Sequence, residues 1–143
     1  MGVVKALKAL AEIPINKRSR DAEKTIEKGA EYMLKHHVYK RSHDLKRTSN
    51  PNWLKFGFPL LWQTDTLEIL RILTKLGYRD EQMQEAVDLV VSKQDNNCRW
   101  RLESLPPPQE SFYRNFSTII EQRGSPSKWI TLNALRVLKG FYG

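Results

Sequence analysis

The chain has 143 residues, which is enough for one domain with its own core and too few for two comfortable ones. Its composition, 40% hydrophobic and 28% charged, excludes a disordered chain, and no apolar run reaches the length of about 18 residues that a transmembrane helix needs. The net charge of +8 is spread over every segment, so we interpret it as a solvated surface and expect no nucleic-acid partner. Without a transmembrane segment, we expect a cytoplasmic protein.

Similarity within the chain predicts helices of two kinds that alternate. Three segments align without gaps, namely 3–10, 66–73 and 131–138. Each has apolar residues around a polar one, then a basic residue, then two more apolar residues. Two further segments, 25–34 and 82–91, also align. Because the two sets alternate along the chain, they predict a helical-hairpin repeat. The expected inner helices cover about 3–13, 59–76 and 126–141, and the expected outer helices cover about 20–37 and 80–94.

The two kinds of helix differ in the distribution of their apolar residues. The outer helices are amphipathic, which suits helices that cover a core from outside. The central inner helix, 59–76, is apolar on nearly all faces, so we expect other helices to flank it. Pro59 suits its first turn, and Gly77 suits its C-terminal exit. The predicted fold is therefore an all-α helical-repeat domain over residues 1–143, with an inner and an outer layer.

Two long connections join these helices, and loops of such length often line binding sites. About twenty residues, including Trp53, lie between the second helix and the third. About thirty residues, including the three prolines at 106–108, lie between the fourth helix and the fifth. Within the latter connection, 111–121 fits either a further helix or an extended segment.

The turn after the fourth helix carries the most recognisable motif. Gln94 is followed six residues later by Trp100, which resembles the QW repeat of squalene cyclases and other terpenoid cyclases. With 56–65 and 124–132, the whole chain resembles the C-terminal end of bacterial and archaeal proteins with prenyltransferase and squalene-oxidase repeats. The resemblance implies a partial α/α toroid in which Gln94 and Trp100 are structural and stiffen the outer helices. Cys98 stands where the motif has Gly, and its side chain disfavours the positive φ of a tight turn.

The catalytic residues of those enzymes are not found in the sequence. Terpenoid cyclases protonate an alkene with an Asp-rich motif, whereas Asp65 is a single carboxylate that we interpret as a first-turn helix acid or the partner of a nearby base. Protein prenyltransferases use an Asp, Cys and His zinc site. Here the single Cys98 lies in the QW-like turn, and His36, His37 and His43 do not offer three ligands on one helical face. We therefore expect no catalytic residue, no metal and no cofactor.

Five residues are candidates to line a cavity: Trp53, Phe58, Trp62, Asp65 and Trp129. Aromatic side chains shield isoprenoid cations in toroid enzymes, so the resemblance implies an isoprenoid or another apolar small molecule as ligand. A basic rim around an aromatic interior suits an isoprenyl diphosphate. Ordinary packing between helix layers accounts for the same residues and is the simpler interpretation.

These features predict a non-catalytic repeat domain, similar to those of terpenoid cyclases and prenyltransferases, with a structural or apolar-ligand-binding role at its inner helical face. Two and a half hairpins do not close a toroid, so we expect a fragment of a longer chain or completion as a homo-oligomer. The alternative is a terpenoid cyclase or prenyltransferase whose catalytic residues lie in a missing N-terminal portion. A third hypothesis is a binder of anionic surfaces, driven by the charge of +8.

Overall fold

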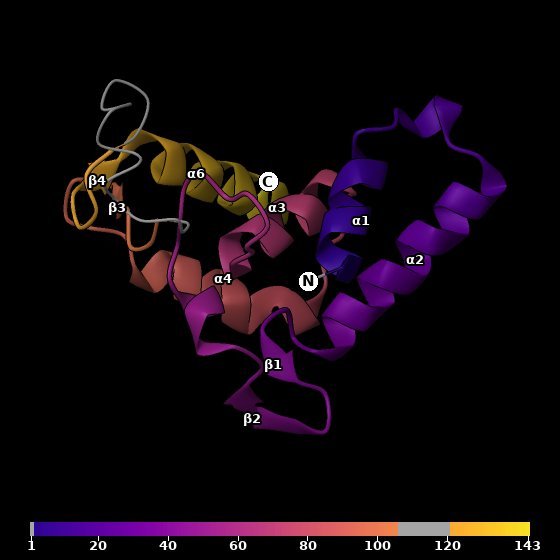
Figure 1. Ribbon diagram of the computed structural model, residues 1–143, viewed down its shortest axis with the longest axis horizontal. Helices are drawn as coiled ribbons and strands as arrows, with labels where there is room; N and C mark the ends of the chain where they lie inside the picture. The colour runs from indigo at the N-terminus through magenta and orange to yellow at the C-terminus, as the bar shows by residue number, and fades with distance from the viewer. Residues whose placement is uncertain (1, 106–120) are drawn as a thin grey trace.

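The computed structural model describes residues 2–105 and 121–143, and most of them are helical (Figure 1). The α-helices of this part of the chain are α1 (Gly2–Ala11), α2 (Arg20–Lys35), α3 (Thr66–Lys75), α4 (Gln84–Ser92) and α6 (Lys128–Tyr142). Short 3-10 helices cover Ile15–Lys17, Pro51–Leu54 and Glu81–Met83. Two small antiparallel sheets pair β1 (Lys40–Arg41) with β2 (Asp44–Thr48) and β3 (Trp100–Arg101) with β4 (Pro126–Ser127). The prediction of a mostly α-helical chain is confirmed, and none of the helices described is long and apolar enough to cross a membrane.

Two serine side chains set where α2 and α6 begin. Ser19 Oγ accepts a hydrogen bond from Ala22 N at 3.1 Å, and Ser127 Oγ accepts one from Ile130 N at 3.0 Å. Each bond satisfies an N–H group that the first turn of a helix leaves without a partner. α6 therefore begins directly after Ser127, slightly later than the predicted helix 126–141.

The central helix is shorter than the sequence predicts. The expected helix over 59–76 is wrong in its first part, because α3 begins directly after Asp65. Asp65 has an extended backbone, and its Oδ1 accepts a hydrogen bond from Glu68 N at 2.7 Å, which is the geometry of a helix N-cap. Pro59 thus lies outside the helix, where it follows a cis peptide bond. Gly77, at a φ of 90°, lies just beyond the helix end.

The other helices differ from their predicted bounds by a few residues. α2 ends before the predicted limit of 20–37, because His37 and Val38 adopt φ values of 44° and 71°, in the left-handed region that stops a helix. The predicted outer helix 80–94 is divided into a 3-10 turn and α4, and α1 ends at residue 11 rather than 13. The segment 111–121, which fits a helix or an extended chain, lies almost wholly outside the described residues.

α3 is the centre of the fold. In Figure 1 it lies between α1 and α6, and it packs on both. α2 packs on α1, while α4 packs on α3 and α6. Every residue of α3 from Thr66 to Leu73 is buried except Arg71, which is half-buried. The three helices whose sequences align therefore form one row, and the other two helices pack against it.

Two glycines allow neighbouring helices to approach closely. A Cβ atom added at Gly140 of α6 would lie 2.8 Å from Cβ of Thr74 in α3. A Cβ atom added at Gly29 of α2 would lie 2.8 Å from Cδ2 of Leu7 in α1. The absence of a side chain at both positions is thus part of how the helices pack.

Candidate functional site

Residues 57–65, the segment that precedes α3, contribute to the walls of two cavities. The inner cavity, of about 240 Å³, lies among this segment and helices α1, α3 and α6. The loop cavity, of about 420 Å³, lies between the end of this segment and residues 50–55 and 103–105. Leu60 and Asp65 line both cavities. Both candidate sites are therefore built around the residues that lead into α3.

The inner cavity has an apolar part and a charged part. The apolar part consists of Phe58, Pro59, Leu60, Leu67 and Ile72. The charged part consists of Lys8 from α1, Glu12 just after α1, Asp65 just before α3, and Glu68, Arg71 and Lys75 from α3. Leu67 and Ile72 belong to the buried core of α3, so the packing of that helix fixes the apolar wall. Such a combination of surfaces fits a molecule with one apolar and one charged end.

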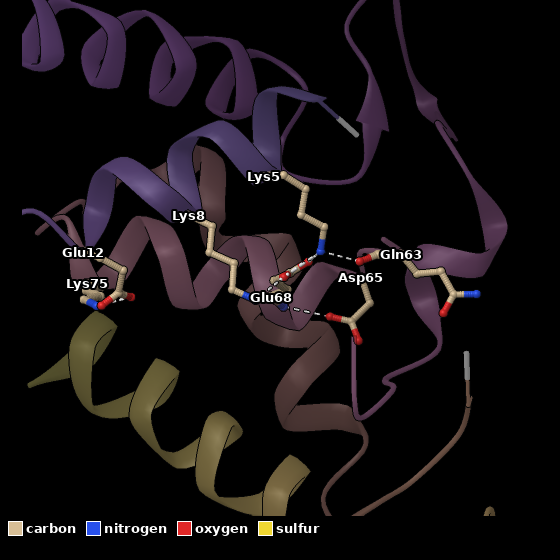
Figure 2. A network of polar contacts seen from close by, with 7 residues as sticks. All are labelled: Lys5, Lys8, Glu12, Gln63, Asp65, Glu68 and Lys75. Carbon is tan, nitrogen blue, oxygen red and sulfur yellow. Dashed lines mark hydrogen bonds and ion pairs between the residues drawn. The ribbon is translucent and has the colours of Figure 1, made fainter. Parts of the chain in front are cut away.

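Ion pairs join α1 to α3 beside this cavity, as Figure 2 shows. Lys5 Nζ lies 2.9 Å from both carboxylate oxygens of Glu68, and Lys8 Nζ lies 2.8 Å from Glu68 Oε1. In the opposite sense, Lys75 Nζ of α3 lies 2.6 Å from Oε1 of Glu12, the residue that follows α1. Glu68 is only 7% exposed, so the two lysines compensate a buried charge. Glu68 therefore holds the two helices together rather than offering a free base.

The ion pairs follow the alignment of the two helices. Lys5 and Glu68 are 63 residues apart, as are Glu12 and Lys75, and α1 aligns with α3 at the same offset, 66 − 3 = 63. Equivalent positions of α1 and α3 thus lie side by side and carry opposite charges. The two helices run parallel and in register.

A row of three bases crosses the same helices. Lys8 of α1, Arg71 of α3 and Arg136 of α6 hold equivalent positions in the three aligned segments. Lys8 pairs with Glu68, whereas the side chains of Arg71 and Arg136 make no hydrogen bond or ion pair within residues 2–105 and 121–143. Burial lowers the pKa of Arg71, and the nearby Arg136 lowers it further, while Glu12 opposes the shift. Two neighbouring guanidinium groups in this state are suited to binding an added anion.

Asp65 links the start of α3 to the segment before it. Its Oδ2 accepts a hydrogen bond from Gly57 N at 2.8 Å, and its Oδ1 accepts one from Glu68 N at 2.7 Å. Burial raises the pKa of Asp65 to about 7, although the two N–H donors and Lys5 act in the opposite direction. Because both oxygens accept backbone hydrogen bonds, we interpret the carboxyl group as a clamp between the two segments.

Four of the five predicted cavity residues line these two cavities, whereas Trp129 lines neither of them. Phe58 lines the inner cavity, Trp53 and Trp62 line the loop cavity, and Asp65 lines both. Trp129 stacks on Phe58, with ring centroids 5.1 Å apart. Sequence reasoning missed the ion pairs between α1 and α3. Their signal was the opposite charge at equivalent positions of aligned segments.

Trp100 fixes the end of α4. The side chain is fully buried, and its Nε1 donates a hydrogen bond to Val90 O at 2.7 Å. Its backbone N donates to Thr131 Oγ1 at 3.0 Å, which ties the turn to α6. Gln94 is exposed at the start of the same turn. Trp100 therefore supports the packing of α4 and α6, and the assignment of a QW repeat to Gln94 and Trp100 stays a prediction.

The turn before Trp100 forms without a glycine. Cys98 has a φ of 58°, so the turn adopts positive φ although this residue carries a side chain that disfavours it. Asp95 stabilises the turn, because its Oδ1 accepts hydrogen bonds from Asn97 N at 2.8 Å and Arg99 N at 2.9 Å. The hydrogen bond from Arg99 is the main cause of the lowered pKa of Asp95. Cys98 itself is exposed.

The histidines lie near the end of α2. Nδ1 of His36 is 2.8 Å from Lys40 O, and His43 is exposed between β1 and β2. In the described part of the chain, no group of three or more His, Cys, Asp or Glu side chains is placed to hold a metal ion.

No protein-family model, no curated protein and no solved structure matches the chain. The function must therefore follow from the two cavities, the ion pairs and the row of bases.

Proposed function

We propose that the chain is a non-catalytic repeat domain, similar to those of terpenoid cyclases and prenyltransferases, that binds a small apolar molecule at its inner helical face. The ligand has an anionic head, as in an isoprenyl diphosphate. One observation carries the proposal: the inner cavity places apolar side chains beside the guanidinium group of Arg71.

The basic row supports an anionic head group. Arg71 and Arg136 repel each other, and a phosphate or diphosphate between them would relieve that repulsion. Guanidinium groups bind phosphate oxygens through paired hydrogen bonds. Asn133 of α6, which also lines the inner cavity, offers a further amide donor.

The size of the inner cavity limits the apolar part of the ligand. Its volume of about 240 Å³ is below the range of about 300–1,000 Å³ that is typical of drug-sized ligands. The cavity therefore suits a short isoprenoid, or the end of a longer one. Affinity is expected to stop rising once the apolar chain exceeds the cavity.

The exposed face of α6 supports a partial toroid that continues beyond this chain. Leu132 and Leu135 are 40% and 49% exposed on the last helix of the row. In repeat proteins, a terminal unit buries its apolar face only against the next unit. A second copy or the remainder of a longer chain would extend the row at this face.

The second candidate function is that of an enzyme, a terpenoid cyclase or prenyltransferase whose catalytic residues lie in an N-terminal portion of a longer chain. Asp65 favours it, because a carboxyl group with a pKa of about 7 is partly protonated at neutral pH, as a general acid needs to be. Cyclisation or prenyl transfer by the purified chain would overturn the non-catalytic proposal, whereas this candidate requires a longer reading frame that carries an Asp-rich motif.

Calorimetric titration with isoprenyl diphosphates of increasing chain length tests the proposal. Arg71→Gln removes the one of the three basic residues lining the inner cavity that has no ion pair within residues 2–105 and 121–143, and it is expected to weaken binding about tenfold or more. Lys28→Gln makes the same change of charge at an exposed site on α2 and is expected to leave the affinity unchanged. Equal weakening in both variants would overturn the proposal, because binding would then depend only on the overall charge of the chain. Absence of binding by the unmodified chain would overturn it as well.

A further inference from the structure

The loop cavity is separate in its chemistry from the inner cavity. Its volume of about 420 Å³ lies within the range of about 300–1,000 Å³ typical of small-molecule sites. Its walls come from residues 50–55, from the end of the segment before α3, from residues 103–105 and from Arg123. Asp65 is the one charged residue that lines both cavities among the described residues. Arg71 and the other charged residues of the inner cavity do not line the loop cavity.

Two buried oxygen atoms of this cavity have no hydrogen-bond partner in the described residues. They are Thr64 Oγ1 and Gln63 Oε1. Thr64 is only 5% exposed, so bulk water does not readily replace the missing partner. Buried polar atoms in native proteins almost always have a partner, and an orphaned one is often completed by a ligand or a bound water. Gln63 Oε1 accepts hydrogen bonds, and the hydroxyl group of Thr64 either donates or accepts one, so hydroxyl groups of a ligand are able to partner both atoms.

The charged groups of the loop cavity are already engaged or lie at its exposed edge. Glu103 receives a hydrogen bond from Lys93 Nζ at 2.6 Å and another from Phe56 N at 2.8 Å. Asp65 is held by its two backbone donors. Lys55 is exposed. The groups open to a ligand inside the cavity are therefore uncharged, which favours an uncharged ligand.

Two indole rings line the same cavity. Trp53 is half-buried, and Trp62 is 49% exposed. An exposed indole beside unsatisfied polar groups is the usual composition of a site for ligands that have both an apolar face and hydrogen-bonding groups.

We infer that the loop cavity binds an uncharged, hydroxyl-rich ligand of the saccharide class. A pyranose ring presents a face of C–H groups to an indole, and its hydroxyl groups donate hydrogen bonds at its edge. One hydroxyl donates to Thr64 Oγ1 and another to Gln63 Oε1, which gives both orphaned oxygens a partner. The ring packs on Trp62, and the less exposed Trp53 lines the same cavity.

Intrinsic tryptophan fluorescence and calorimetry, with glucose, maltose and cellobiose as probes and adenine as a planar contrast, test this inference. Thr64→Val keeps the shape of the side chain but removes the acceptor, and Trp62→Ala removes the ring. Each is expected to weaken saccharide binding about tenfold or more. Leu61→Ala is the matched control, because Leu61 is also 49% exposed but does not line the cavity, and it is expected to bind as the unmodified chain does.

The possible outcomes separate this site from the inner cavity. Saturable saccharide binding that is lost in Thr64→Val and retained in Leu61→Ala supports the inference. Absence of saturable binding up to the solubility of the sugars overturns it, as does binding of adenine alone. Thermal melts identify a variant that fails to fold, and Thr64→Val, which removes an unsatisfied polar atom, is expected to melt no lower than the unmodified chain. Thr64 and Trp62 do not line the inner cavity, so isoprenyl diphosphate binding, measured without a saccharide, is expected to be unaffected by either variant.

Discussion

Lys5 of α1 and Glu68 of α3 occupy the same place in two aligned helices, and their side chains meet at 2.9 Å. Glu12 and Lys75 repeat the relationship with the signs reversed, at 2.6 Å. Two copies of the same helix in this register would place like charges side by side, which is unfavourable. The change of sign between the two helices therefore favours the packing of α1 on α3 over the packing of either helix on a copy of itself.

A double-mutant cycle with Lys5→Met and Glu68→Gln measures this interaction. Because Glu68 is buried, we expect a coupling energy of about 0.5–3 kcal/mol from urea denaturation. The control cycle uses Lys75→Met and Glu12→Gln, whose parent side chains are 41% and 70% exposed, and a smaller coupling is expected there because water screens the pair. Equal coupling energies would show that burial of Glu68 has no special effect.

Asp65 should make stability depend on pH near neutrality. Its folded pKa of about 7 is above the ordinary value of about 3.9, so the folded chain binds this proton more tightly than the unfolded chain. Between about pH 4 and pH 7 the free energy of unfolding is then expected to fall as pH rises, by at most about 1.4 kcal/mol per pH unit, and to level off above pH 7.

Asp65→Asn isolates that contribution. Asparagine still caps α3 through its side-chain oxygen but does not titrate, so the variant should lack this part of the pH dependence. Urea denaturation of both proteins from about pH 5 to about pH 8 checks the expectation. Parallel stability profiles for the two proteins would mean that the carboxyl group is ionised throughout this range.

Two tryptophan-to-phenylalanine substitutions should differ in cost. Trp100→Phe removes the hydrogen bond to Val90 O and leaves that buried carbonyl with one bond fewer, for which we expect a loss of about 1–3 kcal/mol. Trp129→Phe removes an Nε1 atom that is buried without a partner in the described residues, so its loss should be smaller. Guanidinium denaturation measures both. A larger loss of unfolding free energy in Trp129→Phe would mean that the lost ring volume, rather than the lost hydrogen bond, determines the cost of the substitution.

Alanine at the two close-packed glycines should also give unequal results. Gly140→Ala places a methyl group against Cβ of Thr74, which is fixed to the backbone of α3, and we expect a loss of about 1–3 kcal/mol. Gly29→Ala meets the end of the Leu7 side chain, which is able to rotate away, and alanine is the better helix former. The melting temperature of Gly29→Ala is therefore expected to stay closer to that of the unmodified chain. A melting temperature for Gly29→Ala below that of Gly140→Ala would contradict this account.

The positions of the helices are readable from the sequence, but the start of α3 shows where pattern reading fails. Leu60, Leu61 and Trp62 continue the apolar pattern of the helix, so periodicity alone extends it to Pro59. The corrective signal is also present. Asp65, with a glutamate three residues later and an apolar run after it, is a helix-start signature, and the structure shows that this local hydrogen bond outweighs the apolar pattern.

The candidate site was predictable only in part. The aromatic residues Trp53, Phe58 and Trp62 stand out in the sequence, yet their division between two cavities depends on the path of the chain before α3. That path is fixed by the hydrogen bond from Gly57 N to Asp65 Oδ2. A contact between a side chain and a backbone N–H eight residues away leaves no periodic trace in a sequence, so no pattern could have revealed it.

Leu60 and Asp65 belong to both cavities, and this has a thermodynamic consequence. A ligand that moves either residue in one cavity reshapes the other. Linkage requires any such effect to be mutual: whatever factor one ligand applies to the affinity of the second, the second applies to the affinity of the first. The sign of this cooperativity would depend on whether both ligands favour the same position of the segment before α3. Through the residues that the cavities share, the two binding equilibria would be coupled.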